Sequence, residues 1–77
     1  MSDTAERVKK VTAETLKIDV SMIKDDSRFV EDLGAESIQS VELVAAFEEE
    51  FDIEMDEQGA LGVKDIGTAV TFIEKHL

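Results

Sequence analysis

The chain has 77 residues, enough for a modest core, and we expect residues 1–77 to form a single small domain. It contains no cysteine, which excludes disulfides and cysteine-ligated zinc. The formal net charge is −11, and residues 31–57 hold 11 acidic residues and no lysine or arginine. This charge argues against nucleic-acid and anionic-membrane binding and favours basic protein partners, although a solvated acidic face would have the same composition.

Two further properties bear on location. No apolar run approaches the roughly 20 residues that span a bilayer, so we expect no membrane insertion. The polar N-terminal residues lack the apolar core of a signal peptide. We therefore expect a cytoplasmic protein. We also expect it to be a monomer.

Apolar residues at helical spacing predict a helix at each end of the chain. In the first segment they are Ala5, Val8, Val11, Thr12, Thr15 and Leu16. Asp3 or Thr4 is expected to cap that helix. In the last segment they are Ile66, Ala69, Val70, Ile73 and Leu77. Asp65 is its predicted N-cap, and Lys75 and His76 suit its C-terminal dipole.

The first connection is predicted to be a long loop over residues 17–36, because periodicity is absent there. Its apolar residues suggest that it packs over the core; they are Ile18, Val20, Ile23, Phe29, Val30 and Leu33. Between Asp56 and Lys64, Gly59 and Gly62 predict at most a short, weak helix.

Residues 37–51 predict a helix with two apolar faces when they are projected at about 100° per residue. One is an ordinary core face, made of Leu43, Val44, Phe47 and Phe51. The nearly opposite face carries Ile38, Val41 and Ala45, surrounded by Glu42, Glu48, Glu49 and Glu50. Core burial does not account for the second face, so we interpret it as a docking surface; scattered exposed apolar residues are the alternative.

Ser37 follows a glycine turn at the start of this helix, within residues 32–39 (DLGAESIQ). A serine in that position is usually an N-cap, and either Glu36 or Ser37 could fill that role. A helix N-terminus also favours a phosphate-linked group on a hydroxyl. The residues alone leave both interpretations open.

Patterns for catalysis and metal binding are absent from the sequence. The only histidine, His76, is far from Ser37 along the chain, so no Ser-His-acid arrangement is indicated. The glycines form no phosphate-cradling motif, and the acidic residues do not match EF-hand spacing. We predict no catalytic residues and no metal site, and hence a protein that is not an enzyme.

Residues 29–38 (FVEDLGAESI), 41–44 (VELV) and 47–51 (FEEEF) closely resemble the acyl carrier proteins of dissociated, type II synthases. The resemblance runs over the full chain and implies a small, all-α four-helix bundle with three main helices, one short helix and a long first loop. It also implies that Ser37 carries 4′-phosphopantetheine, which is derived from coenzyme A and holds acyl groups as thioesters. Such a carrier shuttles acyl intermediates between enzymes of fatty-acid or related biosynthesis.

The resemblance further implies two sets of site residues. The surface for basic patches on the phosphopantetheinyl transferase and acyl-processing enzymes would comprise Glu36, Ile38, Val41, Glu42, Ala45, Glu48 and Glu49. The bundle interior would open to hold an acyl chain, lined by Phe29, Leu43, Phe47, Met55, Ala60, Val63, Ala69 and Phe72.

The chain also departs from the pattern of these carriers. Residues 36–38 (ESI) stand where Asp-Ser-Leu is usual, Asp56 replaces a common proline, and glycines occupy positions 59, 62 and 67. These changes suggest a specialised carrier. Two alternatives are an aminoacyl or peptidyl carrier domain, and an unmodified interaction module that keeps the fold without the arm.

Overall fold

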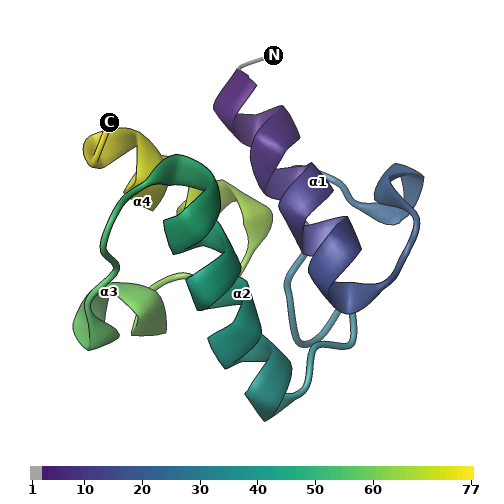
Figure 1. The fold of residues 1–77 in the computed structure, drawn as a ribbon. Helices are drawn as coiled ribbons and strands as arrows, with labels where there is room; N and C mark the ends of the chain where they lie inside the picture. Colours follow the sequence, from purple (N-terminus) through teal and green to yellow (C-terminus); the bar gives the residue numbers. More distant parts are fainter. Residues whose placement is uncertain (1–2) are drawn as a thin grey trace.

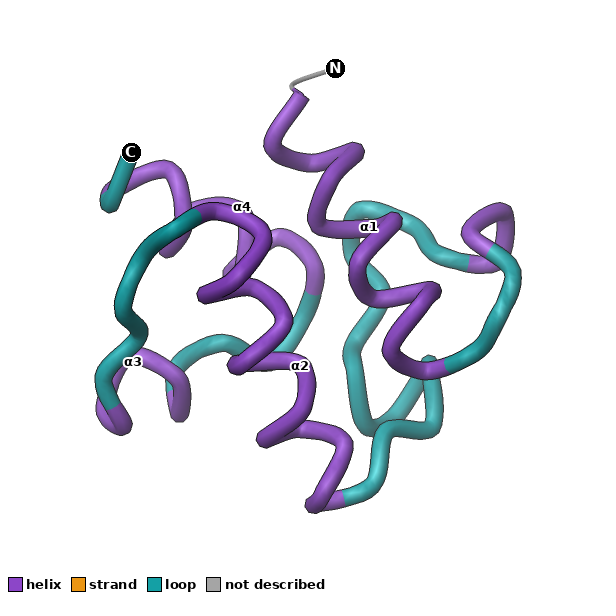
Figure 2. Tube along the Cα trace, viewed as in Figure 1, coloured by secondary structure: helices purple, strands orange, loops and turns teal. Residues whose placement is uncertain are grey.

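The computed structural model describes residues 3–77, apart from the side chain of Glu57. It contains α1 (Asp3–Leu16), a 3₁₀ turn η1 (Val20–Met22), α2 (Ser37–Phe51), α3 (Glu57–Leu61) and α4 (Ile66–Lys75) (Figure 1). The described residues form no strand, and a single isolated bridge joins Arg28 and Asp65. The predicted all-α bundle with three main helices, one short helix and a long first loop is confirmed (Figure 2).

The core lies where α1 packs against both α2 and α4. Its least exposed side chains come from these three helices: Val8, Thr12, Phe47, Ile66, Ala69 and Ile73. Thr12 is tolerated there because its hydroxyl donates a hydrogen bond of 2.7 Å to the carbonyl of Val8. The short α3 lies at the edge of the bundle, on the side of α2 away from α1 (Figure 1).

The structure bears out only some of the predictions for the helix ends. Asp65 caps α4 as predicted, because its carboxylate accepts a hydrogen bond of 2.7 Å from the N–H of Thr68. The prediction that Asp3 or Thr4 caps α1 is wrong, since both residues lie inside the helix. Leu77 is 65% exposed beyond the end of α4, so its assignment to the apolar face is also wrong.

The long first loop packs on the core through only some of its apolar side chains. Ile23 and Phe29 are buried, whereas Ile18 and Leu33 are half-buried. The prediction fails for Val20 and Val30, which are 48% and 56% exposed. Val20 begins the 3₁₀ turn η1, in which no residue is buried, and the carbonyl of Val30 accepts a hydrogen bond from the N–H of Gly34 in a turn at the surface.

Arg7 ties α1 to the C-terminal end of α2. Its guanidinium contacts the Glu50 carboxylate at 2.8 Å, donates to the Glu50 carbonyl at 2.7 Å and lies 4.4 Å from the centroid of the Phe51 ring. A cation at a helix C-terminus complements the dipole, and the ring adds a cation–π contact. Glu50 is therefore engaged within the fold.

The described part of the chain contains no helix that is both long and apolar enough to cross a membrane.

Candidate functional site

The loop before α2 is held in place by the segment before α4. The N–H of Phe29 donates to the carbonyl of Lys64, and the N–H of Ile66 donates to the carbonyl of Ser27, both at 3.0 Å. The two segments pair as a short antiparallel bridge. This pairing joins the first loop to the start of α4.

Arg28 and Asp32 then close the loop into a turn. The Arg28 guanidinium contacts both Asp32 carboxylate oxygens, at 3.0 and 3.1 Å, and the Arg28 N–H donates to the same carboxylate at 2.9 Å. The hydrogen bonds from Arg28 hold the pKa of Asp32 below its usual range, and the carboxylate raises the pKa of Arg28. Because both side chains are exposed, this pair contributes more to loop geometry than to stability.

Gly34 gives the last turn before the helix. Its φ of +73° lies in the left-handed region, which glycine adopts without the penalty of a side chain. The next residue, Ala35, is buried and donates a hydrogen bond of 2.8 Å to the carbonyl of Phe29. This turn therefore directs the side chain of Ala35 into the core, and the next residues, 36–38, are exposed.

Glu36 is the N-cap of α2, so the structure resolves the choice that the sequence left open. Its backbone is extended, and its N–H donates to the Gln39 side-chain oxygen at 2.9 Å. Ser37 is the first helical residue, and its side chain is exposed. Among the described residues, its hydroxyl has no hydrogen-bond partner, which leaves it available for modification.

The second apolar face of α2 is exposed. Ile38 and Val41 are each 69% exposed, and Ala45 is exposed on the same face. Of the acidic residues predicted around it, Glu36, Glu42, Glu49 and Glu50 are exposed, although Glu50 is paired with Arg7. Glu48 differs: it is half-buried, and its carboxylate accepts a hydrogen bond of 2.9 Å from the N–H of Met55. Glu48 therefore supports the loop after α2 as well as adding charge.

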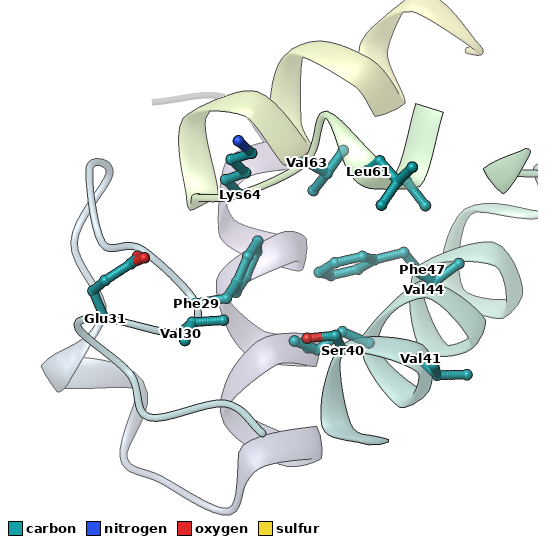
Figure 3. Close-up of a pocket in the computed structure, with 12 residues that line it drawn as sticks. Phe29, Val30, Glu31, Ser40, Val41, Val44, Phe47, Leu61, Val63 and Lys64 are labelled. Atoms are coloured by element: carbon teal, nitrogen blue, oxygen red, sulfur yellow. The ribbon is translucent and has the colours of Figure 1, made fainter. Parts of the chain in front are cut away.

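An apolar channel of about 470 Å³ lies between α2, α3 and the first loop (Figure 3). Five of the eight residues predicted to line an acyl cavity line it: Phe29, Leu43, Phe47, Ala60 and Val63. The residues that the sequence analysis missed are Val30, Glu31, Ser40, Val41, Val44, Leu61 and Lys64. Ser40 lies three residues before Leu43, and Val44 lies three residues before Phe47, a helical spacing that could have identified both.

The other three predicted lining residues lie elsewhere. Met55 and Ala69 are buried in the core, 7% and 0% exposed. Phe72 faces a separate groove between α3 and α4 and stacks on His76, with ring centroids 4.4 Å apart. His76 in turn lies 2.9 Å from the Phe72 carbonyl through Nδ1. His76 is thus occupied at the end of α4.

The described residues contain no cluster of three or more histidine, cysteine or carboxylate side chains that could hold a metal ion. What the site does present is an accessible serine hydroxyl at a helix N-terminus. An apolar channel begins one helical turn further along the same helix.

A model of the phosphopantetheine attachment site family matches residues 6–73. The match covers the first loop, Ser37 and the channel, together with most of α1 and α4. The family is defined by covalent attachment of 4′-phosphopantetheine, and its domains generally act as carriers. The chain therefore belongs to the phosphopantetheine-attachment family of carrier proteins.

Proposed function

We propose that this protein is an acyl carrier and that Ser37 is the residue that bears 4′-phosphopantetheine. The observation that carries this proposal is the exposed, unpartnered hydroxyl of Ser37 at the first position of α2. It lies three residues after the left-handed turn at Gly34, inside the span that the family model matches.

The residues around Ser37 fit a phosphodiester. The first N–H groups of a helix have no intrahelical acceptor, and the helix dipole favours an anion at that end. Ser37 and Ile38 are both exposed, so a transferase has access to the hydroxyl from solvent. When bound, the group supplies a terminal thiol that holds cargo as a thioester.

The chain's own contribution is to shelter the cargo. The channel walls are mainly hydrocarbon, from Leu43, Val44 and Phe47 on α2 and from Ala60 and Val63 on the opposite side. An alkyl chain gains free energy when such walls remove it from water, whereas a charged amino group loses hydration there. The channel therefore favours acyl cargo over aminoacyl or peptidyl cargo.

The exposed face of α2 is proposed to dock partner enzymes. Ile38, Val41 and Ala45 supply a small apolar strip, and Glu42 and Glu49 flank it with negative charge. Basic patches on the transferase and on acyl-processing enzymes complement this surface. Contacts that depend on charge associate quickly and release readily, as a carrier that visits several enzymes requires.

Residues 36–38 (ESI) lead us to assign the protein to a specialised branch of fatty-acid or related acyl biosynthesis. Glu36 occupies the cap position and is exposed, so a transferase that docks on Ser37 also meets its longer carboxylate. Equal turnover of this protein and a general fatty-acid carrier by the same synthase enzymes would contradict this assignment.

Intact mass spectrometry tests the proposed function. The protein is incubated with coenzyme A and a phosphopantetheinyl transferase, alongside Ser37→Ala and Ser40→Ala variants. We expect one phosphopantetheine adduct on the unmodified sequence and on Ser40→Ala, and none on Ser37→Ala. Absence of an adduct with several transferases would favour an unmodified interaction module, and an adduct on Ser37→Ala would refute the assigned residue.

A further inference from the structure

The start of α2 departs from the ordinary preference for capping residues. Serine is among the strongest N-cap residues and glutamate is not, so this preference favours Ser37 as the cap. The structure has the opposite arrangement, in which Glu36 is the N-cap with an extended backbone and Ser37 is the first helical residue. A contact from elsewhere in the helix must therefore favour Glu36.

Gln39 supplies that contact. Its side-chain oxygen accepts the hydrogen bond of 2.9 Å from the Glu36 N–H, as the third helical residue does in a capping box. The Glu36 carbonyl accepts a hydrogen bond of 3.0 Å from the N–H of Ser40, so both backbone groups of the cap are held by the helix. If Ser37 were the cap, Ser40 would be the third helical residue, and a serine there does not complete a capping box. Gln39 thus stabilises only the arrangement in which Glu36 is the cap.

The two arrangements differ in what the Ser37 hydroxyl does. A serine at the N-cap accepts a hydrogen bond through its side-chain oxygen from an N–H of the first turn, which engages the hydroxyl with the helix. At the first helical position, the Ser37 side chain is exposed and has no hydrogen-bond partner among the described residues. Of the two arrangements, only the observed one leaves this oxygen free to react.

We propose that Gln39 is a positioning residue for the modification, because it selects Glu36 as the cap and so keeps the Ser37 hydroxyl available to the phosphopantetheinyl transferase. This inference rests on the proposed function. Gln39 acts through Glu36 and needs no contact with the transferase or with coenzyme A. Without the Gln39 side chain, Ser37 competes for the cap, and the transferase then binds only the fraction of molecules whose hydroxyl is free.

A double-mutant cycle on the transferase reaction tests the proposal. KM and kcat are measured for the unsubstituted sequence, for Gln39→Ala, for Glu36→Asp and for the variant with both changes. Aspartate is a strong N-cap through its own side chain, so position 36 should remain the cap in Glu36→Asp even without Gln39. Gln58→Ala is the matched control, because Gln58 is an exposed glutamine on a different helix, α3.

In the unsubstituted background, we expect Gln39→Ala to raise the KM for the carrier about fivefold, the population shift that corresponds to loss of one capping contact. The kcat should stay unchanged, because the first turn of a helix rearranges much faster than an enzyme turns over. In the Glu36→Asp background, Gln39→Ala should change the KM less than about twofold, and Gln58→Ala should leave it unchanged. An equal rise in both backgrounds would overturn the proposal, since it would indicate direct contact between Gln39 and the transferase. An unchanged KM in Gln39→Ala would overturn it as well.

Two further results separate the possible failures. In NMR hydrogen exchange, the Glu36 N–H should exchange faster in Gln39→Ala than in the unsubstituted sequence, and equal rates would refute the cap contact itself. Absence of any phosphopantetheine adduct on the unsubstituted sequence would refute the proposed carrier function. An adduct that forms with the same KM in all four members of the cycle would refute only the positioning role of Gln39.

Discussion

Replacing Gly59 in α3 with alanine has two opposing effects on the stability of the protein. Alanine is favoured over glycine inside a helix by about 1 kcal/mol, so the sequence alone predicts stabilisation. In the structure, the added Cβ would lie 2.6 Å from the Phe72 Cζ atom and 2.9 Å from the Asp56 carboxylate. Phe72 is half-buried and stacked on His76, so its ring cannot move away freely.

The steric cost of the added Cβ atom is larger than the gain in helix propensity. Overpacking of this kind costs about 1–3 kcal/mol, and disturbing the Asp56 cap of α3 adds up to about 1 kcal/mol. We therefore expect Gly59→Ala to lower the free energy of unfolding by about 1–2 kcal/mol, a large fraction of the stability of a small domain.

Urea unfolding followed by circular dichroism measures this difference, with Gly67→Ala as the matched control. A Cβ atom at Gly67 would meet its nearest neighbours at 3.5 and 3.6 Å, which is ordinary contact, so Gly67→Ala is expected to stabilise the protein by about 0.5–1 kcal/mol. Stabilisation of both variants to the same extent would refute the close contact between Gly59 of α3 and the Phe72 ring.

Three further predictions follow from the loop, an ion pair and the acidic surface. Gly34→Ala should cost about 1–2 kcal/mol in urea unfolding, because alanine is strained at a φ of +73° although space is open there; an unchanged midpoint would contradict the left-handed turn. The hydrogen bond from Lys9 lowers the pKa of Asp25, so the stability from this pair is present above about pH 4 and is lost as the pH falls through the lowered value. NMR titration of Asp25 should show this low pKa, and a pKa that Lys9→Met leaves unchanged would exclude the pair as its cause. Glu42→Lys should slow association with the transferase about tenfold at low salt without lowering the melting temperature, whereas Glu74→Lys on α4 should have little effect; rates that do not depend on salt would contradict charge steering.

The bounds and the faces of a single long helix could be predicted from the sequence. The bounds of α2, its buried face and its exposed second face all follow from a fifteen-residue pattern of apolar and acidic side chains. Asp65 was likewise predictable as a cap, because an aspartate directly before an apolar periodic segment has few other roles.

Features that depend on contacts between segments could not be predicted. Glu48 and Glu50 read as surface charge, yet one accepts a hydrogen bond from Met55 and the other pairs with Arg7. Val20 and Val30 read as core residues, but local turns leave them exposed.

The central claim is that Ser37 carries the arm, and tandem mass spectrometry of the protein isolated from its native cell tests it most directly. A peptide that spans residues 36–41 contains both Ser37 and Ser40, so fragment ions distinguish the two hydroxyls. We predict a phosphopantetheine group on Ser37 and an unmodified Ser40. A modified Ser40, or a peptide without the group in protein from cells whose other carriers are loaded, would contradict the account.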